Sequence, residues 1–451
     1  MAGINIKQKE YKMQKKLTIV SLIILFFLKG NARASVFDTF GVDSQGIAMG
    51  NARTASATDW TATYYNPAGI TQQKKTLGAS FMFIWNHLDV KPFPGSTGLE
   101  NKDSSNIQGL SLGLTYDFGV DIFRVGLGLY LPLNDVQEQI THWADEREAF
   151  FTNKLYFEIY ENRTEHQIIL PTVALKVLPY LSIGGGVSLF IRSITYSNVY
   201  LPNVLNQSDV FININNVQKY TYVPNLGVLF HPSNDFKIGI SYMGQDSFPI
   251  EGASYVDVPQ LGQHFTQTIE QIVFYTPAHI SAGIMYKPTS SVELNADITW
   301  VGWSGYKDNH NEVPQTSWID PSTNSLQQGQ AWSDIYVPRI GLKYLADSSW
   351  SFMAGYFYEP SPVPPQMQRS NYVDNVANVI SAGSGYKVPY REGNINFVIH
   401  AQAHILGDRK TYKEIAVDAD PNTPGIQNPG YPGYESKGYI FDTGFEVSYG
   451  F

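Results

Sequence analysis

Hydrophobic and polar residues alternate with a period of two near the C-terminus of the chain. Between residues 438 and 451, the odd positions are mostly aromatic or aliphatic and the even positions are mostly polar or small. Because successive side chains of a β-strand point to opposite faces, this pattern predicts a strand with one apolar and one polar face. The alternation recurs at residues 109–118, 123–131, 292–300 and 395–404. Such strands are typical of a membrane β-barrel, which turns its apolar face to lipid.

Along the whole chain the pattern predicts about 14 strands. They begin near residues 76, 106, 121, 166, 180, 219, 235, 271, 290, 334, 348, 378, 393 and 438. The short connections lie near residues 118–121, 178–180, 231–235, 287–290, 346–348 and 388–393. The long ones lie near residues 88–105, 132–165, 197–218, 247–270, 303–333, 359–377 and 407–437. An even strand number with short periplasmic turns and long extracellular loops indicates a bacterial outer-membrane barrel.

Residues 1–34 have the pattern of a signal peptide. Lys15 and Lys16 precede the apolar run 17–28, and Ala32-Arg33-Ala34 matches an A-x-A cleavage site. The apolar run is too short to span a bilayer, so we expect cleavage after Ala34 rather than a permanent anchor. Met13 is an alternative start, because the residues before it resemble no part of a signal peptide.

Two later segments do not alternate. Residues 35–71 are rich in Ala, Gly and Thr and precede the first strand, so we expect them inside the barrel or in the periplasm. The loop 135–160 has helical character. The barrel itself is expected to occupy residues 76–451.

The composition supports a barrel and narrows the chemistry. Charged residues make up 16% of the chain, against about 25% in ordinary globular proteins, and aromatic residues make up 14%. The net charge of −9 and the lack of a basic tract argue against a nucleic-acid partner. The absence of cysteine excludes disulfides, thiolate metal sites and cysteine nucleophiles. Motif searches find no nucleophile elbow, Walker loop or zinc-protease signature, and we expect no enzyme activity, metal or cofactor.

Several stretches of the sequence resemble one known family. The run from Gly46 to Asp59, followed by Tyr64-Tyr65-Asn66-Pro67-Ala68-Gly69, looks like the hatch motif of the FadL/TodX hydrophobic-compound channels of the outer membrane. Further stretches that read as strands or motifs of this family are 129–132, 224–227, 239–242, 276–278, 300–304 and 355–364, and Phe451 looks like the terminal signal for the barrel-assembly machinery. The resemblance covers essentially the whole chain after residue 34.

This resemblance implies a 14-stranded antiparallel barrel whose lumen is plugged by a small, mostly helical N-terminal hatch, here residues 35–75. It also implies passive uptake of long-chain fatty acids or other hydrophobic molecules, through an interior pocket and a lateral exit in the barrel wall. Transfer of a hydrophobic solute out of water is favourable by about 0.8 kcal/mol per buried methylene, so its release into lipid is favoured. Expected partners are the hydrophobic substrate, outer-membrane lipid and lipopolysaccharide, and the barrel-assembly machinery, with the protein a monomer in a Gram-negative outer membrane.

One stretch departs from the family pattern. Family members often carry an acidic and a basic residue in the sixth long loop, in a Pro-Asp-x-x-Arg-like run. Here the run 371–378 keeps Asp374 and has no Arg in the matching place. A carboxylate-binding role for this loop is therefore in doubt.

The candidate gate is Asn66-Pro67-Ala68-Gly69. Proline fixes its own φ and biases Asn66 to an extended backbone, so the turn can hold a plug in one geometry. An ordinary Asn-Pro turn is the competing interpretation. Gly126 and Gly128 lie on one face of a predicted strand, where they would permit a lateral gap, admit the hatch, or simply fill the lumen.

Five cationic side chains fall on predicted lumen faces and are candidates to bind a fatty-acid carboxylate: Arg124, Lys176, Lys237, Arg339 and Lys343. The competing interpretation is that they pair with lumen carboxylates to stabilise the interior. Alternative functions are an uptake channel for aromatic hydrocarbons or alkanes, a lipase-type barrel enzyme, and a structural or adhesive barrel. The hatch motif argues against the last two.

Overall fold

The computed structural model describes residues 39–73, 75–95, 106–133, 167–200, 211–258, 263–306, 331–367, 372–414 and 430–451. For residues 191–200, 211–219, 248–258 and 263–274 it describes the backbone alone. The predicted signal peptide and the loop 135–160 lie outside the described residues.

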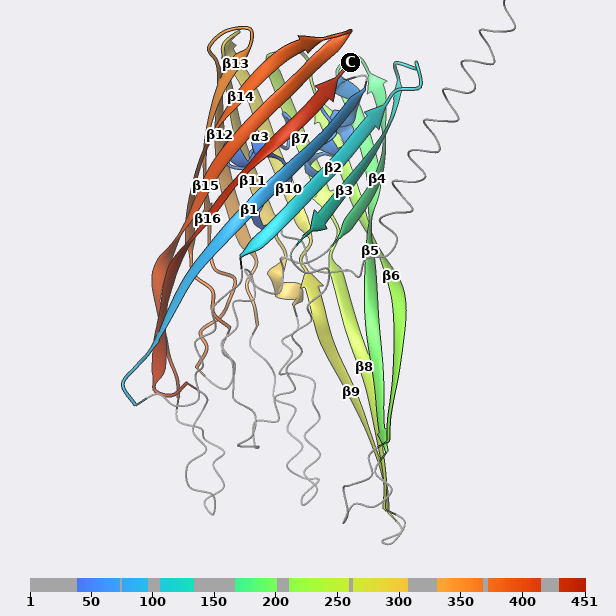
Figure 1. Cartoon of the computed structure of the whole chain (residues 1–451), viewed down its shortest axis with the longest axis vertical. Coiled ribbons are helices and arrows are strands. Elements are labelled where there is room, and N and C mark those ends of the chain that lie inside the picture. Colours follow the sequence, from blue (N-terminus) through green and yellow to red (C-terminus); the bar gives the residue numbers. More distant parts are fainter. Residues whose placement is uncertain are drawn as a thin grey trace, which may run out of the picture.

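Fourteen strands pair in one closed antiparallel barrel, as the alternation predicted (Figure 1). In chain order they are β1 (Thr76–Pro92), β2 (Ile107–Tyr116), β3 (Phe123–Pro132), β4 (Ile168–Leu178), β5 (Leu181–Tyr200), β6 (Phe211–Phe230), β7 (Phe236–Met243), β10 (His279–Thr289), β11 (Val292–Val301), β12 (Ile335–Leu345), β13 (Trp350–Glu359), β14 (Ala377–Tyr390), β15 (Gly393–Tyr412) and β16 (Gly433–Gly450). Each strand pairs with its neighbour in this order, and β1 pairs with β16 to close the sheet.

The prediction was wrong between β7 and β10. The expected long loop 247–270 is a hairpin of β8 (Asp246–Val258) and β9 (Gln263–Thr276), which pair with each other in a sheet outside the barrel. The strand expected from residue 271 therefore belongs to β9, and the wall strand begins at His279. The long β5–β6 and β8–β9 hairpins both project from the long-loop end of the barrel (Figure 1). The alternation of hydrophobic and polar residues predicts a strand, but it does not predict which sheet that strand joins.

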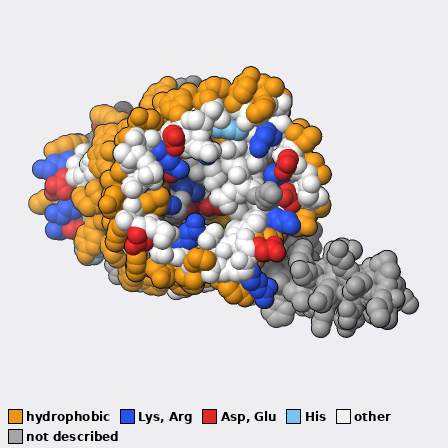
Figure 2. Space-filling view, turned by 90° about the horizontal axis from the view of Figure 1, so that it is seen from above, with side chains coloured by type: hydrophobic (Ala, Val, Ile, Leu, Met, Phe, Trp, Pro, Cys, Tyr) orange, Lys and Arg blue, Asp and Glu red, His pale blue; other side chains and the backbone are white. Residues whose placement is uncertain are grey.

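The two faces of the wall differ as the sequence predicted. Phe445, Ile399 and Ile340 expose 53%, 61% and 57% of their surface on the outside, whereas Asp442 and His404 are fully buried inside. Viewed onto the short-turn end, hydrophobic side chains form the outer rim and charged and polar groups fill the interior (Figure 2). Among the described residues, no helix is long and apolar enough to cross a membrane.

The N-terminal segment folds inside the barrel as short helical turns. They are α3 (Ser44–Ala48), α4 (Ala62–Tyr65) and the 3₁₀ helix η1 (Pro67–Gln72). Asp43 caps α3, because its side chain accepts a hydrogen bond from the Gly46 backbone N–H at 2.9 Å. We call this segment, residues 39–73, the hatch.

The hatch backbone lies directly against glycines of the wall. A Cβ atom at Gly184 of β5 would collide with the Pro67 carbonyl and the Ala68 nitrogen, and one at Gly239 of β7 with the Thr54 carbonyl. Glycine is thus required where a second backbone approaches this closely. The same holds for Gly341 and Gly355, which face the backbone of Met49 and Gly50, whereas Gly78, Gly113 and Gly227 make room for the side chains of Trp60 and Asn66.

Arg409 clamps the loop after β13 at the long-loop end. A β-bulge in β15 between Leu406 and Arg409 shifts the register there. The guanidinium donates to Ser361 Oγ at 2.9 Å and to the carbonyls of Asp374, Val363 and Pro364 at 2.7, 2.8 and 3.1 Å. An arginine of β15, 35 residues further along the chain, thus contacts the backbone carbonyl of Asp374.

Asp374 itself is buried in this clamp. Burial raises its pKa to about 7, against the opposing hydrogen bond from Ser361 and the charge of Arg409, while Glu359 adds to the increase. The neighbouring Asn375 donates to the carbonyls of Gly407 and Ser436 at 2.6 and 2.9 Å. The loop is thus docked on β15 and β16 by Arg409 and Asn375, around a carboxyl group whose pKa is raised by burial.

We expect Gly184→Val to strain the hatch, because its side chain would enter the space of the Pro67–Ala68 peptide. Overpacking of this kind costs about 1–3 kcal/mol. Gly185→Val is the matched control, since a Cβ there meets the Leu226 side chain at 3.3 Å and the Asn225 carbonyl at 3.7 Å and touches no hatch atom. Denaturant unfolding in detergent and protease cleavage of the hatch measure both effects. Equal stability and equal protection of the two variants would contradict the close packing.

We expect the loop after β13 to be held more tightly at pH 5 than at pH 8. A carboxyl whose pKa is raised in the docked state favours docking at low pH, and this contribution is lost as pH rises from about 4 to about 7. Hydrogen exchange of residues 361–367 and 372–376, corrected for intrinsic rates, measures the docking. Asp374→Asn should abolish the pH dependence; a dependence that persists in this variant would assign it to another group.

Candidate functional site

A cavity of about 90 Å³ lies between the hatch and the long-loop end of the barrel. The hatch forms one side of it and strands β6, β7 and β10–β13 form the other. Its lining residues are Thr39, Gly41, Asn51, Thr54, Tyr64, Tyr65, Asn225, Ser241, Met243, His279, Ser281, Thr299, Val301, Trp303, Val337, Arg339 and Glu359. This volume admits several water molecules but not a long acyl chain, so a large ligand requires it to widen.

The cavity is amphipathic, and Arg339 supplies a cation to its polar part. Arg339 Nη1 donates to Thr299 Oγ1 at 3.2 Å, and the guanidinium lies 5.0 Å from the centre of the Phe357 ring. Asp297, which faces Arg339 across the β11–β12 ladder, instead accepts from the Thr54 N–H of the hatch at 2.8 Å. The apolar lining comes from Met243, Val301, Trp303 and Val337.

Five aromatic side chains cluster beside the cavity: Tyr275, Trp303, Tyr306, Trp332 and Tyr372. Trp332 is central, with ring centres 5.1 Å from Trp303, 4.7 Å from Tyr306 and 5.4 Å from Tyr372. Only Trp303 of the five lines the cavity. We refer to these five residues as the aromatic cluster. Sequence reasoning missed it, because its rings come from β9 and from segments after β11, before β12 and before β14 that only the fold brings together.

The candidate gate links the hatch to the wall through one side chain. Asn66 is extended, at φ −163° and ψ 103°, as the following proline favours. Its amide donates to Thr54 O at 2.8 Å and to Val228 O of β6 at 3.1 Å, and its Oδ1 accepts from the Ala68 N–H at 3.2 Å. Pro67, Ala68 and Gly69 are buried beside it.

Gly126 and Gly128 face the hatch. A Cβ atom at Gly126 would collide with Thr63 Cγ2 and one at Gly128 with Thr63 Oγ1. Strand β3 pairs continuously with β2 and β4 at both positions. The structure thus shows the hatch packing against these glycines, and a lateral opening there stays a prediction.

The five predicted cations lie in different surroundings. Arg339 lines the cavity, whereas Lys343 donates to Gln45 Oε1 of the hatch at 2.7 Å. Arg124 lies at the short-turn end and donates to the carbonyls of Gln73, Phe123 and Val120. Lys176 and Lys237 line neither the cavity nor the vestibule described next. Of the five, Arg339 alone is placed to meet a ligand in the cavity.

A second, larger space of about 370 Å³ opens at the short-turn end below the hatch. Arg53 and Asp59 of the hatch and Glu293, Lys343 and Glu446 of the wall line this vestibule. Figure 2 shows charged side chains of both signs inside the rim at this end. Arg53 is buried against Asp59, at 3.9 Å. The vestibule is therefore wet and polar and separated from the cavity by the hatch.

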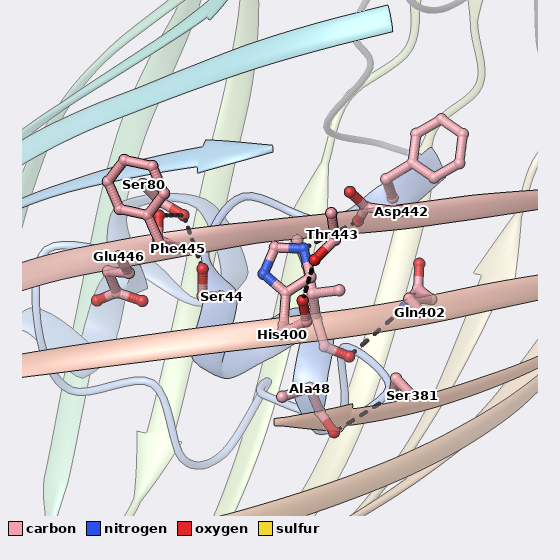
Figure 3. Close-up of polar contacts among 12 residues, drawn as sticks. Ser44, Ala48, Ser80, Ser381, His400, Gln402, Asp442, Thr443, Phe445 and Glu446 are labelled. Carbon is pink, nitrogen blue, oxygen red and sulfur yellow. Dashed lines mark hydrogen bonds and ion pairs between the residues drawn. The ribbon is translucent and has the colours of Figure 1, made fainter. Parts of the chain in front are cut away.

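Helix α3 is tied to β1, β14 and β16, and Gln402 of β15 donates to its Ile47 carbonyl at 3.5 Å (Figure 3). Ser44 Oγ lies 3.3 Å from Ser80 Oγ, the Gln45 N–H donates to Glu446, and the Ala48 carbonyl accepts from Ser381 Oγ at 3.3 Å. His400 pairs with Asp442 at 3.2 Å beneath the helix. This side of the hatch is fixed by polar contacts, whereas η1 lies against the glycines of β5 and β6.

Comparison with known proteins agrees with this architecture. The family model described as outer membrane protein transport protein (OMPP1/FadL/TodX) matches residues 27–449. No curated protein matches the chain in sequence.

Several solved structures share the fold. A Pseudomonas aeruginosa FadL homologue has a TM-score of 0.55 and 14% identity, with 93% of this chain and 98% of that chain covered. The Ralstonia pickettii toluene transporter TbuX has a TM-score of 0.53 and 14% identity, with 92% and 100% covered. The P. putida toluene transporter TodX has a TM-score of 0.53 and 14% identity, with 91% and 99% covered. With the hatch, the closed barrel and the match over residues 27–449, the chain belongs to the OMPP1/FadL/TodX family of outer-membrane transport proteins.

Proposed function

We propose that this protein takes up long-chain fatty acids passively across the outer membrane, through the cavity and a lateral exit in the barrel wall. The observation that carries the proposal is Arg339, a half-buried cation in a cavity with an apolar part. A guanidinium binds a carboxylate through charge-assisted and often bidentate hydrogen bonds. Met243, Val301 and Trp303 offer the acyl chain an apolar surface in the same cavity.

The orientation of the ligand follows from the two ends of the cavity. Arg339, Asn51 and Thr54 place polar groups near the hatch, and Trp303 joins the cavity to the aromatic cluster. A fatty acid would therefore lie with its carboxylate towards the hatch and its chain towards the aromatic cluster. The cavity must widen at the aromatic end, where loops rather than wall strands carry Trp332 and Tyr372.

The gate in this proposal is the turn Asn66-Pro67-Ala68-Gly69. Asn66 of this turn donates to the carbonyl of Thr54, which lines the cavity, and to the carbonyl of Val228 in β6. A carboxylate that displaces Thr54 or Asn51 would loosen the same network that holds the turn. The loaded chain then moves into lipid, where each methylene gains about 0.8 kcal/mol over water.

Uptake of aromatic hydrocarbons is the second candidate, and the aromatic cluster favours it. Aromatic rings pair favourably with one another at centre distances of 4.5–7 Å, on the order of 0.5–1.5 kcal/mol beyond burial. A hydrocarbon such as toluene has no group for Arg339 to bind, so the two candidates depend on different residues. A structural or adhesive barrel would leave both Arg339 and the cavity without a role.

We expect Arg339→Gln to lower fatty-acid uptake about tenfold or more, because hydrogen bonds to a charged group contribute about 1.5–3 kcal/mol. Uptake of radiolabelled oleate and toluene is measured in cells that lack their own channel. Lys237→Gln is the matched control, a buried lumen cation outside the cavity. Oleate uptake unchanged by Arg339→Gln, with toluene uptake present, would move the function to aromatic hydrocarbons.

We expect Asn66→Ala with Pro67→Ala to lower uptake while surface expression stays intact. The double variant loses the hydrogen bonds to Thr54 and Val228 and the fixed turn between them. Entry of a large polar antibiotic is measured in parallel, because a lost plug would leave an open pore. Normal uptake with no antibiotic entry would show that the turn is structural and not a gate.

A further inference from the structure

The lumen faces of β7, β10 and β11 form three rows of paired residues beside the cavity. The first row, nearest to the short-turn end, lies against Thr54 of the hatch and consists of Gly239, Gly283 and Asp297. The second row consists of Ser241, Ser281 and Thr299. The third row, towards the long loops, consists of Met243, His279 and Val301. The cavity is therefore layered, with hydroxyl groups next to the hatch and a mostly apolar row beyond them.

All three residues of the second row, which we call the hydroxyl row, line the cavity. Ser281 Oγ lies 2.9 Å from Thr299 Oγ1, which accepts from Arg339 Nη1 at 3.2 Å. Ser241 is 9% exposed, and its hydroxyl makes no hydrogen bond to another described residue. A ligand that displaces water from this row must supply hydrogen bonds of its own or leave buried hydroxyls unpaired, which is costly.

Two charged side chains lie at one end of the hydroxyl row and also line the cavity. Arg339 of β12 can only donate hydrogen bonds, and Glu359 of β13, when ionised, can only accept them. Glu359 lies two residues beyond Phe357, the partner of Arg339, so both side chains belong to the lumen face. A ligand head that fits this place must therefore offer an acceptor to the guanidinium and a donor to the groups around it.

A plain fatty acid satisfies only part of this arrangement. Its carboxylate can accept from Arg339, but the methylenes that follow offer nothing to Ser281 or Thr299. A site built to hydrogen-bond a ligand hydroxyl discriminates against the analogue that lacks it, because its own polar groups are then left unpaired. Neighbouring strands lie about 4.8 Å apart, so Thr299 and Ser281 are within a few carbon atoms of a carboxylate held by Arg339.

We propose that the preferred substrates of this protein are hydroxylated fatty acids, with a hydroxyl group a few carbon atoms from the carboxylate. The inference rests on the proposed uptake function and names the substrate class within it. The carboxylate binds Arg339, and the hydroxyl donates to and accepts from Ser281 and Thr299. The rest of the chain lies along the third row and continues towards Trp303.

The test compares two acids that differ by one hydroxyl group, radiolabelled β-hydroxymyristate and myristate. Initial uptake rates are measured in cells that lack their own channel and express the natural protein or a variant. Ser281→Ala removes the central hydroxyl of the row, and Ser281→Thr retains a hydroxyl there. Ser111→Ala is the matched control, because Ser111 is a buried serine of β2 outside the cavity. Surface expression of each variant is measured in parallel.

We expect the natural protein to prefer β-hydroxymyristate about fivefold, as one or two neutral hydrogen bonds provide. Ser281→Ala should abolish this preference without lowering myristate uptake, whereas Ser281→Thr and Ser111→Ala should keep it. Equal uptake of the two acids by the natural protein would overturn the inference and leave the proposed function intact. An equal loss of both acids in Ser281→Ala would show a structural role and also overturn it. If neither acid enters, the proposed function fails and the inference with it.

A second measurement separates binding from metabolism in the cell. The purified natural protein and Ser281→Ala are loaded with a fluorescent fatty acid in detergent, and each unlabelled acid is added as a competitor. We expect β-hydroxymyristate to compete at about fivefold lower concentration than myristate with the natural protein, and at the same concentration with Ser281→Ala. Equal competition by the two acids with the natural protein would overturn the inference.

Discussion

Closure of the backbone ladder is the constraint on which the rest of this structure depends. In lipid, each unpaired backbone group costs several kcal/mol, so a sheet survives there only without edges. Strand β1 meets β16 from Thr76–Gly450 to Pro92–Tyr434, and that pairing removes the last edge. Once the wall is closed, the lumen becomes an interior that polar side chains and a hatch must fill. Any path out of it must pass either the hatch or a weakened ladder.

The hatch and wall meet by close backbone contact as well as by side-chain burial. Glycines on β5, β7, β12 and β13 let the hatch backbone approach the strands, while α3 is held by serines and carboxylates of β1, β14 and β16. Two kinds of attachment follow. The α3 side is fixed by directed hydrogen bonds. The η1 side combines close backbone packing with hydrogen bonds to β5 and β6, from Thr71 to Ser182 and from Asn66 to Val228 O.

Alternation in the sequence was sufficient for the barrel, because lipid outside and polar groups inside impose a period of two on every wall strand. It failed for β8 and β9, which pair with each other rather than with the wall. The motif around Asn66 located the hatch turn, and lumen-facing periodicity included Arg339 among five cations. Identifying Arg339 as the one of these cations that lines the cavity required the position of the hatch in the structure. The contacts of Arg409 and of the aromatic cluster could not be predicted from the sequence, because their partners are brought together only by the fold.

The partition between the two interior spaces is thin. Thr54 lines the cavity on the long-loop side of the hatch, and its neighbour Arg53 lines the vestibule on the short-turn side. A single peptide link therefore separates the two spaces at this point. Asp297 accepts a hydrogen bond from the Thr54 N–H, and Gly239 leaves room for the Thr54 carbonyl. A shift of this one amide would therefore join the two spaces while the barrel wall stays closed.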